Sequence, residues 1–325
     1  MQQYQTSTGR RADLEALETN PVLGFIGNQI LPVLPVHEKT GTIYYKTLTA
    51  DGAAQTGRSA GAAPTRTLLT DSNTTFSVAE AIKRYGVTRD EVKQMGGIEA
   101  ADKLGGMASK RSVQRAIEES IADAILLNGT ATQDNIENSF IQTAQTGLEA
   151  IRRYPGRKAL VMSHTIFNRV MRYTEITDRF GLASAQISNS GAGSITAADI
   201  LARRPEALRM LLSAIIGCDE ILVGDDDQWY DSDANKQERA ALLVLPDPEP
   251  FSHKMDPTLG KMVQYLPDGV QPYVVESFYD PDDKTNNYDA ASWYQTKILN
   301  AGALYLLTGI DELNASSTTT TTTTV

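Results

Sequence analysis

The sequence predicts an α+β protein, and three observations carry that prediction. Apolar residues three or four apart run through residues 98–125, which is the spacing of one face of a long helix. Short apolar runs at 158–162, 220–223 and 240–245 are typical of buried strands. Helices and strands do not alternate at a regular interval, so the pattern does not favour a parallel βαβ series.

The composition argues against several kinds of site. The chain has 325 residues and a formal net charge of −10, from 30 Lys and Arg against 40 Asp and Glu. An acidic excess argues against a dedicated nucleic-acid binder, which needs basic residues to displace counterions from phosphates. The single cysteine, Cys218, excludes an internal disulfide and a cysteine-rich zinc site. Three widely spaced histidines do not favour a metal centre built on imidazole.

The first forty residues indicate neither secretion nor a membrane span. Residues 1–11 are polar and lack the apolar core of a signal peptide, and residues 21–36 are too few to span a bilayer. A cytosolic, reducing compartment fits the single thiol. Pro21, Pro32 and Pro35 favour extended backbone among apolar residues. This segment is either a strand at the edge of the main core or an arm that lies on a neighbouring subunit.

Residues 40–87 predict a long hairpin that projects from the body of the protein. Strand-like runs at 42–48 and 74–79 flank a stretch at 50–64 that is too small and glycine-rich to form a core. A loop of this length inside a compact domain is uncommon, so we expect that a partner orders it or that it is mobile. The alternative is an ordinary mobile surface loop.

A long helix is expected over residues 88–128. Thr88 and Glu91 have the spacing of a capping box, which marks its start. Two glycine pairs, Gly96-Gly97 and Gly105-Gly106, interrupt its first half. Each glycine lowers helix stability by about 1 kcal/mol relative to alanine. The pairs indicate close packing, a break into two helices, or a hinge that lets the helix bend.

The second half of the chain is expected to mix helices and strands. The expected elements are helices at 140–154, 163–171 and 205–217, strands at 158–162, 220–223 and 240–245, and extended runs at 273–279 and 291–307 around a polar turn at 280–287. A glycine- and serine-rich linker at 188–194 and a threonine-rich tail at 318–324 are not expected to pack a core.

Two acidic runs have the carboxylates that bind a hard cation. Asp225, Asp226 and Asp227 follow a strand and offer a magnesium site. No phosphate-binding loop or second acidic cluster accompanies them, so a solvated loop is the favoured interpretation. The acidic turn at 280–283 is better explained as the tip of a hairpin, because it lacks the residues that complete a calcium loop.

A third run begins like a calcium loop and then departs from the motif. Asp231, Asp233 and Asn235 have the spacing of the first three ligands. Lys236 replaces the required glycine, and Leu242 replaces the bidentate glutamate. The match fails at the two positions on which calcium binding most depends.

Candidate nucleophiles also have a simpler structural interpretation. Ser163 and His164 lie where a strand enters a helix, but Val161 and Thr165 stand where a nucleophile elbow has glycines. Ser163 or Thr165 is therefore expected to cap the helix. Cys218 is expected to be a small buried residue. The sequence thus predicts no catalytic residue, no cofactor-binding residue and no metal ligand.

Three local patterns and their order carry a resemblance to a known family. Residues 159–163 and the following helix look like a strand-serine-helix unit, 217–224 contain the pattern G-x-D-x-x-L-V-G, and 293–307 look like closing strands. With the preceding arm, glycine-rich hairpin and long helix, they resemble the major capsid proteins of tailed double-stranded DNA bacteriophages, which have the HK97-like fold. The resemblance covers nearly the whole chain.

The resemblance implies a division of the chain into named parts. These are an N-terminal arm (1–39), an E-loop hairpin (40–87) that reaches over a neighbouring subunit, a P domain with a spine helix (88–189), an A domain (190–268), closing strands of both domains (269–313) and a flexible threonine-rich tail (314–325).

The resemblance also implies a function. The chain would assemble as hexamers and pentamers into an icosahedral head that encloses double-stranded DNA without sequence-specific binding. It would be located in the virion after assembly in the host cytoplasm, with no enzymatic activity, no cofactor and no contact with a membrane. Scaffolding, portal and cementing or decoration proteins would be its further partners.

Two departures from the family limit what the resemblance implies. Residues 51–69 contain Arg58 and Arg66 but no lysine, so we expect no covalent lysine–asparagine bond of the kind that some relatives form there. About forty residues precede the hairpin, so we expect a scaffold to be a separate protein or a piece already removed. The negative charge fits an inner wall that does not bind DNA tightly.

Other functions remain open from the sequence. An encapsulin-like nanocompartment would have the same fold and would enclose cargo enzymes instead of a genome. An intracellular metal-dependent hydrolase would use Asp225, Asp226 and Asp227. A phage tail or baseplate protein is disfavoured by the long helix.

Overall fold

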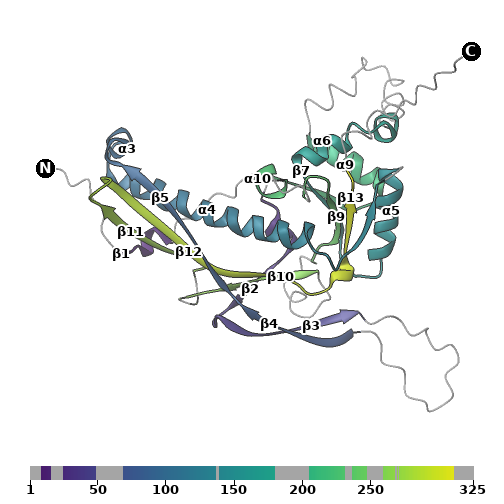
Figure 1. Cartoon of the computed structure of the whole chain (residues 1–325), viewed down its shortest axis with the longest axis horizontal. Helices are drawn as coiled ribbons and strands as arrows, with labels where there is room; N and C mark the ends of the chain where they lie inside the picture. The colour runs from purple at the N-terminus through teal and green to yellow at the C-terminus, as the bar shows by residue number, and fades with distance from the viewer. Residues whose placement is uncertain are drawn as a thin grey trace, which may run out of the picture. The chain divides into compact units, whose positions relative to one another are not determined.

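The computed structural model describes residues 9–15, 25–48, 69–136, 139–179, 205–230, 236–246, 259–267, 269 and 271–310, and Figure 1 labels its helices and strands. The chain divides into two compact units, one of residues 1–124 and 249–299 and the other of residues 125–248 and 300–325. Both units combine helices with a sheet, which confirms the α+β class. Within the described ranges, every helix is too short or too polar to cross a membrane.

The sheet of the first unit is built around one long strand, β12 (Thr285–Ile298). Its other strands are β1 (Gly9–Arg10), β2 (Val33–Val36), β5 (Ala79–Thr88), β10 (Gly260–Tyr265) and β11 (Val274–Asp280). β11 and β10 pair antiparallel with successive parts of β12, and β5 pairs antiparallel with residues 285–294. Because residues that pair with β11 or β10 also pair with β5, β5 lies along the opposite edge of β12.

A break divides the long helix that was expected over 88–128. The chain forms α3 (Arg89–Gln94) and α4 (Ile98–Leu126) instead (Figure 1). Between them, Gly96 and Gly97 have φ angles of 85° and 142°, which glycine adopts far more readily than other residues. The interpretation of a glycine pair as a break between two helices is therefore right for this pair.

The second glycine pair lies where α4 packs on the sheet. A Cβ atom added at Gly105 would lie 2.1 Å from Cδ2 of Tyr288 on β12. Tyr288 is buried, and its hydroxyl donates a hydrogen bond to Asp102 on α4. The Tyr294 hydroxyl likewise donates to the carbonyl of Ala116 at 3.1 Å, so the even-numbered residues of β12 face α4. Close packing is therefore the right interpretation for Gly105.

The strands β3 (Thr40–Leu48) and β4 (Leu69–Ser77) form an antiparallel ribbon of their own. The ribbon confirms that the chain makes a hairpin here, and the expected glycine-rich tip lies outside the described residues. Residues 79–87, which were expected to belong to the hairpin, instead pair with β12 as part of β5. In Figure 1 the ribbon extends beyond the end of the sheet to which β5 belongs.

The N-terminal segment of the first unit is only partly extended. β2 pairs parallel with β10, which confirms a strand at the edge of the core for residues 33–36. Residues 27–30 form the short helix α2 (Gly27–Ile30), where extended backbone was expected. The helix forms because the buried Glu118 carboxylate of α4 accepts hydrogen bonds from the amides at its start.

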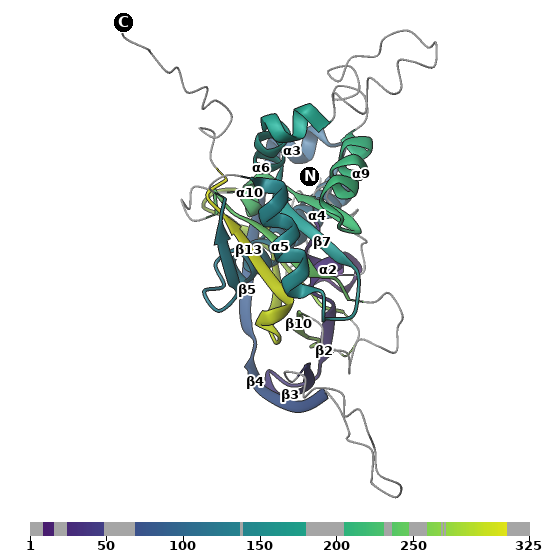
Figure 2. The ribbon, with the colours of Figure 1, turned by 90° about the vertical axis from the view of Figure 1, so that its right-hand side faces the viewer.

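The second unit contains a mixed sheet covered by helices. Its strands, in spatial order, are β6 (Thr132–Asn135), β13 (Leu304–Thr308), β9 (Ala240–Val244), β7 (Lys158–Ser163) and β8 (Glu220–Gly224). Its principal helices are α5 (Phe140–Ile151), α6 (His164–Val170), α9 (Pro205–Ile216) and α10 (Asp226–Trp229). α5 packs against β13 and β9, as Figure 2 shows. The strands that were predicted near residues 160, 221 and 242 are thus confirmed, and the structure places them side by side in one sheet.

Candidate functional site

The acidic run after β8 stabilises the fold. The two carboxylate oxygens of Asp226 accept hydrogen bonds from the amide and the hydroxyl of Thr165, both at 2.8 Å, at the start of α6. Asp227 is exposed, but Asp226 and Asp227 form the first turn of α10, so the run is not the solvated loop that the sequence favoured. Among the residues that the structure describes, no three His, Cys, Asp or Glu side chains lie close enough together to hold a metal ion. The geometry therefore gives the hydrolase alternative no support.

The other two acidic runs are also accounted for. Residues 281–284 form the turn between β11 and β12, which confirms the expected hairpin tip. In this turn, the Asp280 carboxylate accepts a hydrogen bond from the Asp282 amide at 3.0 Å. The calcium-like run at 231–235 lies outside the described residues.

The candidate nucleophiles of the second unit are buried or engaged. Ser163 is fully buried, and its hydroxyl oxygen accepts a hydrogen bond from the Ile166 amide at 3.1 Å. The prediction that this serine caps α6 is therefore confirmed. Cys218 is buried between α9 and β8, which confirms its expected role as a small core residue. Burial raises the pKa of the Cys218 thiol to about 11.

We expect Cys218 to react slowly with thiol reagents in the native protein. With a pKa of about 11 in place of the usual 9.0, its thiolate fraction at pH 8 is about 100-fold smaller than that of a free thiol. Limited access slows the reaction further. Ellman's reagent, added at pH 8 with and without urea, measures the difference. A native thiol that reacts as fast as the unfolded one would contradict the prediction.

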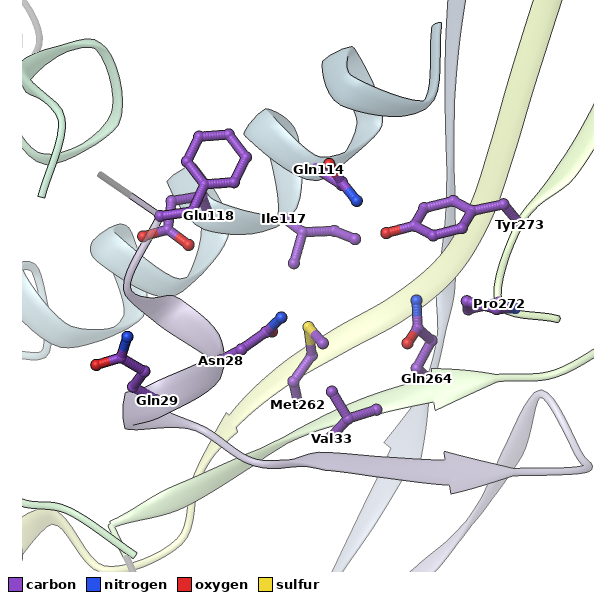
Figure 3. A pocket seen from close by; sticks show the side chains of 11 residues that line it. Asn28, Gln29, Val33, Gln114, Ile117, Glu118, Met262, Gln264, Pro272 and Tyr273 are labelled. Atoms are coloured by element: carbon purple, nitrogen blue, oxygen red, sulfur yellow. The ribbon is translucent and has the colours of Figure 1, made fainter. Parts of the chain in front are cut away.

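A cavity of about 470 Å³ lies in the first unit (Figure 3). Its lining residues come from α2, β2, α4, β10 and the segments next to them: Phe25, Asn28, Gln29, Val33, Gln114, Ile117, Glu118, Met262, Gln264, Pro272 and Tyr273. In Figure 3 the polar ends of Asn28, Gln114, Gln264 and Tyr273 point into the cavity. Val33, Ile117 and Met262 provide apolar surface.

Glu118 is the one carboxylate among these lining residues, and it belongs to the fold. Its Oε1 accepts hydrogen bonds from the amides of Ile26 at 2.9 Å and Gly27 at 3.0 Å, and its Oε2 accepts from Gly27 at 2.9 Å. A carboxylate here satisfies amides at the start of α2 that otherwise have no partner within the helix. Glu118 is the one charged side chain in the lining, and its carboxylate is engaged by the amides at the start of α2, so the cavity suits uncharged polar groups.

A second set of polar contacts attaches the first described residues to α4. The Arg11 guanidinium donates to Asp102 at 2.9 Å and to Asp13 at 2.6 Å. The Lys110 ammonium donates to the carbonyl of Glu15 at 3.0 Å, and burial lowers the pKa of Lys110. Arg11, Asp102 and Lys110 are charged and buried or partly buried, and they serve as anchors for the N-terminal segment.

The ribbon rests on the face of the sheet that points away from α4. Ile43 and Phe76 of the ribbon form one apolar cluster with Val263 of β10, and Trp293 of β12 packs against it. The Lys39 ammonium lies 4.7 Å from the centre of the Trp293 ring. These contacts fix the base of the ribbon on the sheet.

The opposite face of the ribbon has no cover among the described residues. Successive side chains of a strand point to opposite faces, so Tyr44 points away from the cluster that contains Ile43. Its exposed fraction is 73%, and Thr42, Asn73 and Thr75 share its face. An aromatic side chain exposed in this way on a projecting ribbon is typical of a contact surface. We name the face of Thr42, Tyr44, Asn73 and Thr75 the ribbon face.

Neither the cavity nor the ribbon face was predicted from the sequence. The cavity residues come from separate segments, and asparagine and glutamine have no spacing that marks a site. The ribbon face had one signal, the alternation of side chains in residues 40–48, but the sequence does not show which face packs on the sheet.

Comparisons with known proteins concern the fold. No protein-family model matches the sequence, and no curated protein matches it. A phage-related protein of Bordetella bronchiseptica RB50 is similar in structure, with a TM-score of 0.61 and 19% identity over 96% of this chain and 100% of that chain. A structure from Microbacterium phage Oxtober96 has a TM-score of 0.54 and 7% identity over 90% of this chain and 94% of that one. The capsid structure of Cyanophage P-SCSP1u has a TM-score of 0.51 and 9% identity over 90% and 93%.

The likeness extends over most of each chain that is compared. It includes both units, since each match covers at least 90% of this chain. The chain therefore has the HK97-like fold that the sequence resemblance implied.

Proposed function

We propose that this chain is a major capsid protein, which assembles with copies of itself into a closed shell around phage double-stranded DNA. The observation that carries the proposal is an HK97-like fold with a projecting ribbon whose outer face exposes Tyr44. A ribbon of two strands buries little surface on its own and is marginal in water. A neighbouring copy that covers the ribbon face would supply the missing burial.

The parts of the shell protein follow from this role. The ribbon of β3 and β4 is the E-loop that reaches over a neighbouring subunit, and α4 is the spine helix of the P domain. The expected boundary at residue 190 falls inside the second unit, where β7 pairs with both β8 and β9. We therefore assign the A domain to the second unit as a whole. Hexamers and pentamers are the proposed capsomers, and the virion is the proposed location.

The role needs complementary surfaces and no catalytic step. The buried or engaged states of Ser163, Cys218 and Asp226 are consistent with a protein that is not an enzyme. The interactions that hold a shell together are instead the burial of apolar side chains and the extension of sheets between copies.

Electron microscopy of the purified, concentrated chain tests the proposal. We expect closed polyhedral shells or curved sheets, with sedimentation in the megadalton range. DNA protected from nuclease inside particles from infected cells would distinguish a genome shell from a compartment that encloses enzymes. A small oligomer of fixed size at every concentration and ionic strength would overturn the proposal.

We expect Tyr44→Ser to weaken assembly while the subunit remains folded. Tyr44 is 73% exposed, so its removal changes the isolated subunit little. In the shell, loss of a buried aromatic side chain reduces each contact by about 2 kcal/mol, which raises the concentration needed for assembly at least about tenfold. Light scattering against concentration measures the change, and thermal unfolding of the free subunit serves as the check on folding.

The matched control for this prediction is Thr75→Ser, which lies on the same ribbon face and loses only a methyl group. It should assemble at nearly the wild-type concentration. Equal assembly of the Tyr44→Ser and wild-type proteins would show that the ribbon face is not a contact surface.

A further inference from the structure

The strand β5 has one free edge. Its ten residues pair with β12 along one side, and no other strand in the described part of the chain pairs with the other side. Nearly all of its residues are exposed. A long strand with an open row of amide and carbonyl groups is a template for pairing with another strand.

The side chains of β5 that face away from α4 include two of opposite charge. Glu80, Ile82 and Arg84 lie on this face, because Arg84 pairs in register with Asp289 of β12. The Arg84 guanidinium donates to Asp289 at 2.7 and 2.8 Å and lies 4.7 Å from the centre of the Phe278 ring. Ile82 is 54% exposed, and Glu80 makes no ion pair with a residue that the structure describes.

We infer that β5 pairs antiparallel with β5 of a second copy, about a two-fold axis that passes between the two Ile82 residues. In this register Ile82 lies opposite the partner's Ile82, and Glu80 lies opposite the partner's Arg84. By symmetry the same ion pair forms twice. Residues 79–85 of each copy overlap, and the two sheets continue as one.

The charges of β5 select this register. A two-fold axis perpendicular to the sheet places one residue opposite its own copy. An axis at Glu80, Lys83 or Arg84 places like charges directly opposite each other, which is unfavourable. Axes at Ala81 or Tyr85 place no opposite charges against each other. Only the axis at Ile82 joins Glu80 to the partner's Arg84, and each such pair contributes about 0.2–1 kcal/mol.

Arg84 is prepared for this contact by Asp289. A free cation at the edge of a sheet normally opposes strand pairing. Here the guanidinium already has a bidentate carboxylate partner within its own subunit, so its charge is balanced and its side chain is held in place. Glu80, in contrast, has no ion-pair partner among the described residues until a second copy is present.

The pairing specifies one contact between subunits of the proposed shell, and it therefore rests on the proposed function. A two-fold axis perpendicular to the sheet keeps the faces that carry the ribbons of both copies on the same side. Every subunit of a closed shell must present the same face outward, so the symmetry of this contact fits a contact between neighbouring capsomers. An axis within the plane of the sheet would turn one copy inside out.

A disulfide in assembled particles tests the register. Ile82→Cys places two thiols opposite each other across the two-fold axis, within the range of separations that a disulfide spans. We expect oxidised Ile82→Cys particles to give a band of twice the subunit mass on a denaturing gel without reductant, and no higher multimer, because each copy has one β5 edge. Tyr85→Cys is the matched control, because in this register the two residues 85 lie about 20 Å apart along the strands. It should stay monomeric, as should the wild type, in which Cys218 is buried.

The outcomes separate the pairing from the proposed function. Wild-type chains that form no particles overturn the proposed function. Particles of Ile82→Cys that remain monomeric after oxidation overturn the pairing alone. If Ile82→Cys does not assemble, two further samples are oxidised. The first is the double variant Ala81→Cys and Lys83→Cys, which puts a thiol pair on the other face in the same register. The second is the unassembled Ile82→Cys protein at high concentration. Absence of dimers in both of these samples overturns the pairing as well.

Discussion

Asp102→Ala is expected to lower the free energy of unfolding by about 3 kcal/mol, because it removes the acceptor of two buried or mostly buried donors. Asp102 is 8% exposed, and its carboxylate accepts hydrogen bonds from Arg11 at 2.9 Å and from the Tyr288 hydroxyl. Hydrogen bonds with Asp13 and Asp102 raise the pKa of Arg11, so the guanidinium keeps its charge and cannot relieve the loss by deprotonation. Urea unfolding followed by circular dichroism measures the change.

Asp13→Ala is the matched control, because Asp13 binds the same guanidinium from the solvent side. The hydrogen bond from Arg11 lowers the pKa of Asp13, yet its side chain is mostly exposed and an exposed ion pair contributes about 0.2–1 kcal/mol. The Asp102 variant should therefore lose several times more stability than the Asp13 variant. Equal losses would mean that burial does not strengthen the contact that attaches the N-terminal segment to α4.

The sequence predicted best the elements that depend on neighbouring residues. The capping box is present at the start of α3, where the Thr88 hydroxyl accepts from the Glu91 amide and the Glu91 carboxylate accepts from the Thr88 amide. Three strands of the second unit, β7, β8 and β9, were predicted from short apolar runs, and the structure buries them almost completely. Both the capping box and the apolar runs involve only residues that are close in the sequence, so contacts with distant residues do not change them.

Elements that depend on distant residues were predicted less well. β5 contains charged residues that alternate with no clear period, and it is a strand because β12, about 200 residues later, pairs with it. The extended run expected at 291–307 is divided between β12 and β13, which belong to different units. The break occurs at Ala301–Ala303, a short helical turn of small residues that carries no strong turn signal beyond one glycine.

The candidate surfaces were predictable in outline only. The composition of residues 40–48 predicted that they extend from the body. The assignment of Tyr44 to the ribbon face needed the structure, in which Ile43 shares an apolar cluster with Val263. The edge of β5 was not predicted at all, because the sequence does not show which strand lies last in a sheet. The order of elements identified the fold, and the packing identified the surfaces.

Gly105→Ala distinguishes two interpretations of the second glycine pair, close packing and a hinge in α4. We expect this variant to destabilise the protein by about 2–3 kcal/mol. In an isolated helix this change would be favourable by about 1 kcal/mol. Here the added Cβ would lie 2.1 Å from Cδ2 and 2.4 Å from Cε2 of Tyr288. The ring has little room to move, because it is fully buried and its hydroxyl is held by Asp102. The steric cost therefore exceeds the gain in helix propensity.

Gly106→Ala provides the control, because it brings the same helix propensity at the next position. Its Cβ would lie 3.2 Å from the nearest atom, Cβ of Leu14, a contact that a shift of a few tenths of an ångström relieves. Thermal unfolding should show a lower melting temperature for Gly105→Ala and a value near the wild type for Gly106→Ala. If both variants are as stable as the wild type, close packing does not explain the pair, and the hinge interpretation gains support. If only Gly105→Ala is destabilised, any effect of that variant on assembly reflects lost packing on Tyr288, and a test for bending of α4 must use Gly106→Ala alone.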